Sequence, residues 1–521
     1  MKMSTANGIA SAASVANPQL EEQRQSNNTE QDLHQTEESK SNQNPNARDL
    51  AKLPWLRPKK KMSVVENPTA QTWEDLEAVL AKQPIRRPPA LSDVNPLVIV
   101  ASYNDFGDLA HGPRGTEAIY TLRTYRLDVQ DGSMTLLSVE SGNKNPAFTR
   151  MHPARNVMYS CTESLSENGR VVSYYVNPTT GRMTKLGDVD AQGRSTCYLT
   201  IDKAQRFMLV VNYWSSQVVS MPINQETGAL EKACSIYHPK GPAAAGADVM
   251  NVSHTKHVNH SLNDEAAQRE RQKDPHTHAV VLEPFYGCVA YVPDLGTDTI
   301  HELHFNRDTG ELTWLSDIRV GAAGRAHGPR YIEFHPTLPV CYVINEIGSE
   351  VAVFRVDREK LGRIAALQSG EDVVGQGFHS TLTPYHKIAT IPEAFPKSLN
   401  TCGRIAIHPS GLYVIVSNRG HNSLAVFRVN PKQGGKLSLV GFFHTRGETP
   451  RHYQYDPTGQ YLIVANQDSD SLAVFRFNLS DGKLKFTNNL YHCHSPNFVA
   501  FAMQDNPEDE ENFEDIDSVA S

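Results

Sequence analysis

Two arginines, a glutamate and a histidine stand in a repeated phrase of this sequence, and their side chains suit the binding of an anion and the transfer of a proton. They are His278, Arg330, Glu346 and Arg419. Arginine presents planar, paired donors to a carboxylate, a phosphate or a developing oxyanion, which lysine does not. Either Glu346 or His278 could accept a proton from water, and the sequence leaves open which of them is the base.

The repeated phrase is a unit of short β-branched and aromatic runs that are separated by turn residues. Its first strand ends at Pro336, Pro409 and Pro457 in clear copies, and at Pro153, Lys203 and Pro284 in weaker ones. Three or four strands per unit, repeated about every 48–52 residues, are typical of a β-propeller blade. Two longer gaps, roughly residues 238–274 and 368–400, are predicted to be inserted loops.

Six copies leave one blade to be completed from both ends of the domain. Residues 97–102 resemble a second strand with no first strand before it, and residues 495–501 resemble a first strand with none after it. Pairing them closes a ring and removes sheet edges that would otherwise invite aggregation. The sequence therefore predicts an all-β fold, a seven-bladed β-propeller over residues 92–503 that is closed by pairing the C-terminal strand into the first blade.

The repeat places the candidate residues at two equivalent positions. Six residues before the end of the first strand stand His278, Arg330 and Arg451, and ten residues after it stand Asp294, Glu346, Arg419 and Gln467. In a blade the first strand lines the centre and the second runs antiparallel to it, so the two positions meet at one face. We therefore expect a single site, with Arg451, Asp294 and Gln467 as substrate contacts.

Simpler structural interpretations of these residues exist. Arg330 and Glu346 could form a cross-strand ion pair that locks one hairpin. Asp294 could cap a turn, and His278 could be an interior histidine with satisfied hydrogen bonds. A charged group in a desolvated place is costly, however, and several such groups together are seldom found without a ligand. The group as a whole therefore favours a functional site.

Five short motifs extend the pattern beyond single residues. They are Pro275-His-Thr-His278, Gly328-Pro-Arg330, Val343-Ile-Asn-Glu346, Ser417-Asn-Arg419-Gly-His-Asn-Ser423 and Ala465-Asn-Gln-Asp-Ser469. Through them residues 95–503 resemble the seven-bladed propeller lactonase family, which includes propeller-type 6-phosphogluconolactonases and 3-carboxy-cis,cis-muconate lactonising enzymes. The resemblance implies that His278, Arg330, Glu346 and Arg419 form the active site, and that His276 is a substrate contact that could stand in for His278.

The same resemblance implies hydrolysis of an anionic sugar lactone, foremost 6-phosphogluconolactone in the pentose phosphate pathway. A muconate-type lactonising cycloisomerase would use the same four groups, and a non-catalytic propeller scaffold is a third alternative. Calcium needs about six to eight oxygen ligands, which arginines do not supply, so neither a metal nor a cofactor is expected. His254, His257 and His260 lie in a polar insertion without a fourth ligand and are interpreted as a solvated loop.

Both ends of the chain differ from the repeats. Residues 1–91 are predicted to be a disordered polar extension with one short helix near 72–83, and residues 504–521 an acidic disordered tail. Residues 505–521 hold eight acidic and no basic side chains, so the formal net charge of -8 falls to zero without them. No broad basic face for nucleic acid is therefore expected, and no apolar stretch is long enough to span a membrane.

The cysteines indicate a reducing compartment. There are seven, with no Cys-x-x-Cys pair, and most stand in apolar runs. Such residues are typical of buried free thiols, so we expect a cytoplasmic protein, with organelle targeting left open. The expected ligand is a small-molecule anionic lactone, while the oligomeric state and any protein partners of the termini are not predicted.

Overall fold

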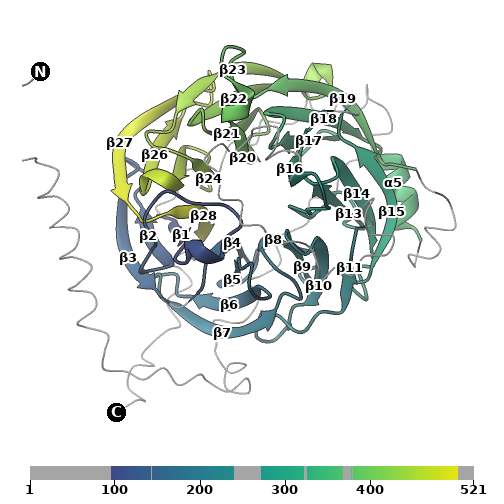
Figure 1. Ribbon diagram of the computed structural model, residues 1–521, viewed down its shortest axis with the longest axis horizontal. Helices are drawn as coiled ribbons and strands as arrows, with labels where there is room; N and C mark the ends of the chain where they lie inside the picture. The colour runs from purple at the N-terminus through teal and green to yellow at the C-terminus, as the bar shows by residue number, and fades with distance from the viewer. Residues whose placement is uncertain are drawn as a thin grey trace, which may run out of the picture. The chain divides into compact units, whose positions relative to one another are not determined.

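The computed structural model describes residues 95–141, 143–239, 271–321, 325–367, 377 and 379–502. These residues form seven four-stranded sheets, all of them antiparallel, that stand around a common centre (Figure 1). The predicted seven-bladed β-propeller is therefore confirmed. The predicted extension at 1–91 with its helix near 72–83, and the acidic tail at 504–521, lie outside the described residues.

Each sheet is built of four consecutive strands, except the one that joins both ends of the domain. That sheet contains β28 (Pro496–Ala502), β1 (Leu97–Ser102), β2 (Leu122–Leu127) and β3 (Met134–Glu140). The next contains β4 (Pro146–Met151), β5 (Val157–Thr162), β6 (Arg170–Val176) and β7 (Met183–Asp190). The third contains β8 (Thr196–Ile201), β9 (Phe207–Asn212), β10 (Gln217–Pro222) and β11 (Ser235–Tyr237).

The other four sheets repeat this order. They contain β12 (Val281–Leu282), β13 (Val289–Asp294), β14 (Thr299–Phe305) and β15 (Leu312–Arg319), then β16 (Pro329–Phe334), β17 (Val340–Asn345), β18 (Glu350–Val356) and β19 (Leu382–Ala389). The last two contain β20 (Thr401–Ile407), β21 (Tyr413–Arg419), β22 (Ser423–Asn430) and β23 (Lys436–His444), and β24 (Pro450–Tyr455), β25 (Tyr461–Asn466), β26 (Ser471–Phe477) and β27 (Leu484–His492). In Figure 1 the first strands, such as β4, β8, β16, β20 and β24, lie nearest the centre.

Helices are few and short in the described residues. The helix α5 (Arg358–Ala365) follows β18, and the carboxylate of Asp357 caps it by accepting a hydrogen bond from the backbone N–H of Lys360. Single 3₁₀ turns occupy loops: η2 (Phe106–Asp108), η4 (Lys397–Leu399), η5 (Pro431–Gln433) and η6 (Gln467–Ser469). Among the helices that the structure describes, none has the length and apolar character to cross a membrane.

The ring closes through the two ends of the domain. Strand β1 pairs with β28 on one side and with β2 on the other, so Leu97 lies opposite both Ala502 and Arg126. Every residue of β1 is buried, because both of its edges are hydrogen-bonded and both of its faces are covered. This pairing confirms the predicted closure.

The predicted loop at 368–400 is wrong in part, because Leu382–Ala389 form β19, the outer strand of its blade. The register of β19 against β18 shifts between Val353 and Phe354, where Pro384 stands opposite Phe354. Proline cannot donate to a strand ladder and is tolerated at an edge strand or a bulge. Pro384 therefore hid this strand in the sequence.

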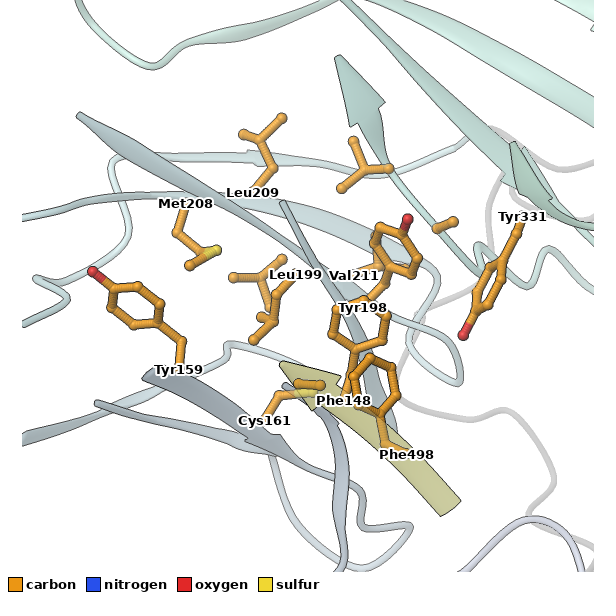
Figure 2. Close-up of a cluster of buried hydrophobic side chains, with 14 of the residues drawn as sticks. Phe148, Tyr159, Cys161, Tyr198, Leu199, Met208, Leu209, Val211, Tyr331 and Phe498 are labelled. Carbon is orange, nitrogen blue, oxygen red and sulfur yellow. The ribbon is translucent and has the colours of Figure 1, made fainter. Parts of the chain in front are cut away.

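Aromatic rings from different blades meet near the centre and are called the aromatic floor below. Phe148 of β4 contacts Tyr198 of β8 and Phe498 of β28, with ring centroids 4.5 and 4.3 Å apart (Figure 2). Tyr198 contacts Tyr331 of β16 at 5.1 Å, and His452 of β24 stacks on Phe498 at 3.8 Å. All five side chains are buried. The floor therefore ties inner strands of different blades together.

Phe498→Ala should lower the free energy of unfolding by about 3 kcal/mol, because it removes a buried ring from both the floor and the closing strand. Chemical denaturation measures the change. The control is Leu490→Ala on β27, where the side chain is 53% exposed and the expected change is within about 0.5 kcal/mol. Equal effects of the two substitutions would contradict the closure described here.

Candidate active site

A β-bulge near the start of six of the seven inner strands leaves one extra residue in the strand. The register of β16 against β17 shifts between Pro329 and Tyr331, which leaves Arg330 as the extra residue. The same shift singles out Arg451 in β24, while His278 follows a Thr277–Asp294 bridge. A bulge re-aims a side chain and is frequent beside functional sites. In β4, β8, β20 and β28 the extra residues are Ala147, Cys197, Gly403 with Arg404, and Asn497.

The second ring of side chains lies where each second strand ends. Going around the propeller, the residues are Tyr103, Glu163, Tyr213, Leu295, Glu346, Arg419 and Gln467. Each stands directly after the residue that pairs with the last inner-strand residue before the bulge or, for Leu295, after the partner of Thr277 in the isolated bridge. Glu346, for example, follows Asn345, which pairs with Pro329. The two predicted positions of the repeat therefore do meet at one end of the propeller.

Asp294 lies one position off this second ring. Its partner across the blade is Thr277, so it is the equivalent of Asn345 and not of Glu346. The turn between Pro284 and Val289 is one residue longer than the turn between Pro336 and Val340, which shifts the count. Its carboxylate accepts hydrogen bonds from the backbone N–H groups of residues 276, 296 and 297, and lies 3.2 Å from a ring nitrogen of His301. Asp294 thus organises a turn behind the site.

Glu346 is the centre of what we call the arginine cluster. Arg271 donates a hydrogen bond to its Oε1. The other oxygen, Oε2, lies 2.8 Å from Nε of Arg330 and 3.0 Å from a terminal nitrogen of Arg419. The Nε2 atom of His278 is 3.9 Å from the same oxygen. The structure therefore brings together all four residues predicted to be catalytic.

Backbone carbonyls fix two of these arginines. Arg330 donates to the carbonyl oxygen of Gly403 at 2.6 Å, and Arg419 donates to that of Cys402 at 2.7 Å. The guanidinium of Arg330 also lies over the ring of Tyr331, 4.2 Å from its centroid, in a cation–π contact. The Nε of Arg419 is buried and has no hydrogen-bond partner among the described residues. The guanidinium of Arg419 therefore keeps one unused donor while its terminal nitrogen contacts Glu346 and Cys402.

Charge at the cluster sets the protonation states. Burial alone would raise the pKa of Glu346, but the charges of the surrounding arginines outweigh it and hold that pKa well below its usual range. Burial, together with the charge of Arg330, lowers the pKa of His278 well below 6.5, so its imidazole is neutral at pH 7. Burial lowers the pKa of Arg419 to about 10. The charge of Glu346 opposes this shift, and the neighbouring guanidinium groups add to it.

A second group, called the Glu163 cluster below, lies at the same end of the propeller. The hydroxyl of Tyr103 donates to Oε2 of Glu163 at 2.7 Å, and Arg451 lies 3.9 Å from that oxygen. Arg451 also donates to the Tyr103 hydroxyl at 3.0 Å, and His111 lies 3.9 Å from Oε1 of Glu163. Arg451 was predicted from the repeat, whereas Glu163 was missed although it stands ten residues after Pro153, the same count as Glu346 after Pro336.

The remaining predicted contacts lie at the edge of the site. Gln467 is buried beside the Glu163 cluster, and its amide nitrogen donates to Asp468 at 3.2 Å. His276 stacks on Tyr213 and Trp214, with centroids 4.7 and 5.3 Å apart. Tyr213 also contacts the ring of His278, edge to face at 5.1 Å. The structure thus places His278 at the arginine cluster and His276 behind an aromatic side chain.

Arg271 was missed because it belongs to an insertion and not to the repeat. Residues 238–274 were predicted to be an inserted loop, and Arg271, near its end, is mostly buried and reaches Glu346. Among the described residues, no three His, Cys, Asp or Glu side chains are grouped so that they could hold a metal ion. His254, His257 and His260 lie outside the described residues. That the site works without a metal stays a prediction.

Comparison with known proteins places this geometry in a family. The family model described as "Lactonase, 7-bladed beta-propeller" matches residues 98–501. The chain belongs to this lactonase family. The matched range contains both rings of side chains, from Tyr103 to Asn497, and so the arginine cluster and the Glu163 cluster alike.

Curated proteins and solved structures of lactonases are similar to the chain. The 6-phosphogluconolactonase of Bacillus subtilis (strain 168) is 28% identical over 342 residues, which cover 66% of this chain and 82% of that protein. The 6-phosphogluconolactonase of Formosa agariphila is 26% identical over 338 residues, covering 64% and 82%. The periplasmic gluconolactonase of Pseudomonas aeruginosa superposes with a TM-score of 0.62 at 22% identity, over 79% of this chain and 99% of that one, which shows the shared fold.

Asp294, which accepts the hydrogen bonds of the turn, also contacts His301, so we expect the free energy of unfolding to depend on the protonation of His301. Burial would lower the pKa of His301, but its contacts with Asp294 and Asp317 raise it to about 9. The stabilisation is therefore complete below about pH 6.5, the unfolded pKa, and is lost as pH rises through about 9. Between pH 6.5 and 10, the unfolding free energy of the wild type should fall relative to that of His301→Gln, by on the order of 3 kcal/mol.

The measurement is urea unfolding at a series of pH values. His492→Gln, at an exposed position on β27, is the matched control and should follow the wild type. Parallel pH profiles for the wild type and His301→Gln would contradict a charged His301 held between the two aspartates.

Proposed function

We propose that this chain hydrolyses an anionic sugar lactone and that 6-phosphogluconolactone is its substrate. The observation that carries the proposal is the set of four buried or half-buried arginines, Arg271, Arg330, Arg419 and Arg451, that lie around the carboxylates of Glu346 and Glu163 in the described part of the chain. The family and the two relatives named 6-phosphogluconolactonase support the choice of reaction and substrate.

The excess of positive charge fits an anionic ligand. Guanidinium groups bind phosphate and carboxylate through paired N–H donors, and the effect is strong where water is excluded. Packing fixes the backbone of the inner strands and the rings of the aromatic floor. The guanidinium donors therefore need little reorganisation when a ligand binds. A phosphorylated lactone would bring a dianion whose charge complements these arginines.

Ring opening needs a donor for the oxyanion that forms when water attacks the carbonyl carbon. The unpartnered Nε of Arg419 and the guanidinium of Arg330 are preorganised for that charge. Glu346 holds these groups in place. Its two oxygens are already engaged by arginines, and its low pKa makes it a weak base, so we assign it the role of anchor.

The proposal includes a place in the cell. All seven cysteines are free thiols, which agrees with a reducing compartment such as the cytoplasm, where the pentose phosphate pathway would use this reaction. The similar gluconolactonase of Pseudomonas aeruginosa is described as periplasmic, so location varies among proteins of this fold. Fractionation of cells that express the full chain tests this part of the proposal.

Purified protein should release acid from 6-phosphogluconolactone faster than the lactone hydrolyses spontaneously in the same buffer. Arg330→Ala and Arg419→Ala should each lower kcat/KM by about 10²-fold, since each removes a donor to the oxyanion or the bound anion. The corresponding lysine variants keep the charge but lose the paired donors, so their rates should lie between those of the alanine variants and the wild type.

The control is Arg476→Ala, an exposed arginine on β26 that should leave the rate unchanged. Thermal unfolding of each variant separates loss of activity from loss of fold. A wild type that does not exceed the spontaneous rate would contradict the proposal. Decay of carboxymuconate absorbance with the same protein would point to the cycloisomerase instead.

A further inference from the structure

Glu163 is the second carboxylate of the site, and nothing in the arginine cluster accounts for it. It follows β5 on the blade that pairs β4 with β5, while Arg451, its nearest cation, belongs to β24. Its side chain is 7% exposed, so this carboxyl group is almost fully buried at the same end of the propeller as Arg330 and Arg419. Burying a carboxyl is costly, and it is seldom retained at such a place without a task.

We propose that Glu163 is the general base and acid of lactone hydrolysis, with Tyr103 and Arg451 as its positioning residues. The inference rests on the proposed function. It assigns the proton transfer to a residue outside the set of His278, Arg330, Glu346 and Arg419.

Geometry distinguishes Glu163 from Glu346. Both oxygens of Glu346 lie within ion-pair distance of arginines, so no oxygen is left to approach a water molecule. Within the described part of the chain, only Oε2 of Glu163 has a close hydrogen bond, from the Tyr103 hydroxyl. The contacts of Oε1 with His111, at 3.9 Å, and of Oε2 with Arg451, at the same distance, are longer than a hydrogen bond. Oε1 of Glu163 is therefore the carboxylate oxygen that can accept a proton.

The environment also supports proton transfer. Burial raises the pKa of Glu163, and Arg451 and the Tyr103 hydrogen bond only partly offset it. A base is most effective when its pKa lies near the working pH, and this shift moves a carboxylate toward that range. The pKa of His278 is shifted away from the working pH, because burial and the charge of Arg330 lower it, and this makes the imidazole a weaker base.

The reaction balances with water as the only co-reactant. Oε1 of Glu163 takes a proton from water as the water oxygen bonds to the lactone carbonyl carbon. The carbonyl oxygen becomes an oxyanion and is held by Arg330 and Arg419. When the carbonyl re-forms, the bond between the carbonyl carbon and the ring oxygen breaks. Glu163 returns its proton to that ring oxygen, which gives the open hydroxy acid and regenerates the carboxylate.

The pH dependence of the reaction follows from the groups that face Glu163. They are Tyr103 after β1, Asp108 in η2, His111 in the following loop, Cys161 of β5, Cys197 of β8, Arg330 of β16 and Arg451 of β24. Because the base must be ionised, kcat/KM should rise with pH through the raised pKa of Glu163 and form an acidic limb. Tyr103 lowers that pKa, so its removal should move the limb to higher pH.

The test is the pH profile of kcat/KM for 6-phosphogluconolactone, corrected for spontaneous hydrolysis, with wild type and variants of the full chain. Glu163→Gln should lower kcat about 10²-fold or more, leave KM within a few fold, and abolish the acidic limb. Tyr103→Phe should shift the limb to higher pH and so lower kcat/KM at any pH within the limb. Glu359→Gln, an exposed glutamate on α5 whose side chain is 85% exposed, is the matched control and should behave as the wild type.

Chemical rescue separates a chemical role from a structural one. Formate added to Glu163→Ala should restore part of kcat, whereas chloride at the same ionic strength should not. The assignment of Glu163 would be overturned if Glu163→Gln kept the wild-type kcat and an unchanged acidic limb, or if formate did not rescue Glu163→Ala. In either case an active wild type would leave the lactonase proposal standing. A wild type no faster than the spontaneous reaction overturns both.

Discussion

The ion pairs of Glu346 are the interaction on which the site depends. Three guanidinium groups of like charge repel one another, and a desolvated charge without a partner costs several kcal/mol. The single carboxylate of Glu346, 4% exposed, compensates that repulsion and holds Arg330 and Arg419 in fixed orientations. The cluster still carries more positive than negative charge. This excess of positive charge favours the binding of an anion, and the ion pairs with Glu346 hold the guanidinium groups in place.

The propeller supplies what this cluster requires of the backbone. In five inner strands the residue after the extra one belongs to the aromatic floor, and in two of these strands the extra residue is an arginine of the site, as Arg330 and Tyr331 show. A charged side chain of the site and an aromatic side chain of the floor are thus consecutive residues of the same strand. Because the inner strands are held by ladders and by rings from other blades, the arginines sit on rigid elements. Side chains from far apart in the sequence meet because the ring is closed by β1 and β28.

Much of this could be predicted from the sequence, because the blade repeats its proline, its turn and its strand ends. That periodicity predicted the seven blades, the closure, and the meeting of His278, Arg330, Glu346 and Arg419. It failed where the repeat is irregular: one extra turn residue after Pro284 displaced Asp294, and Pro384 hid β19. Arg271 stands outside the repeat, so no register could find it. Glu163 stood in register, and the same count from Pro153 would have found it.

A double-mutant cycle between Glu346 and Arg419 tests most directly whether one carboxylate compensates the buried arginines. The free energies of unfolding of the wild type, Glu346→Gln, Arg419→Gln and the double variant would be measured by chemical denaturation at neutral pH. Breaking a buried pair from one side costs about 3–5 kcal/mol. If Glu346 compensates the charge of Arg419, the double variant should lose less stability than the two single variants together, by clearly more than about 0.5 kcal/mol. Additive losses would show that Glu346 and Arg419 act independently and would contradict this compensation.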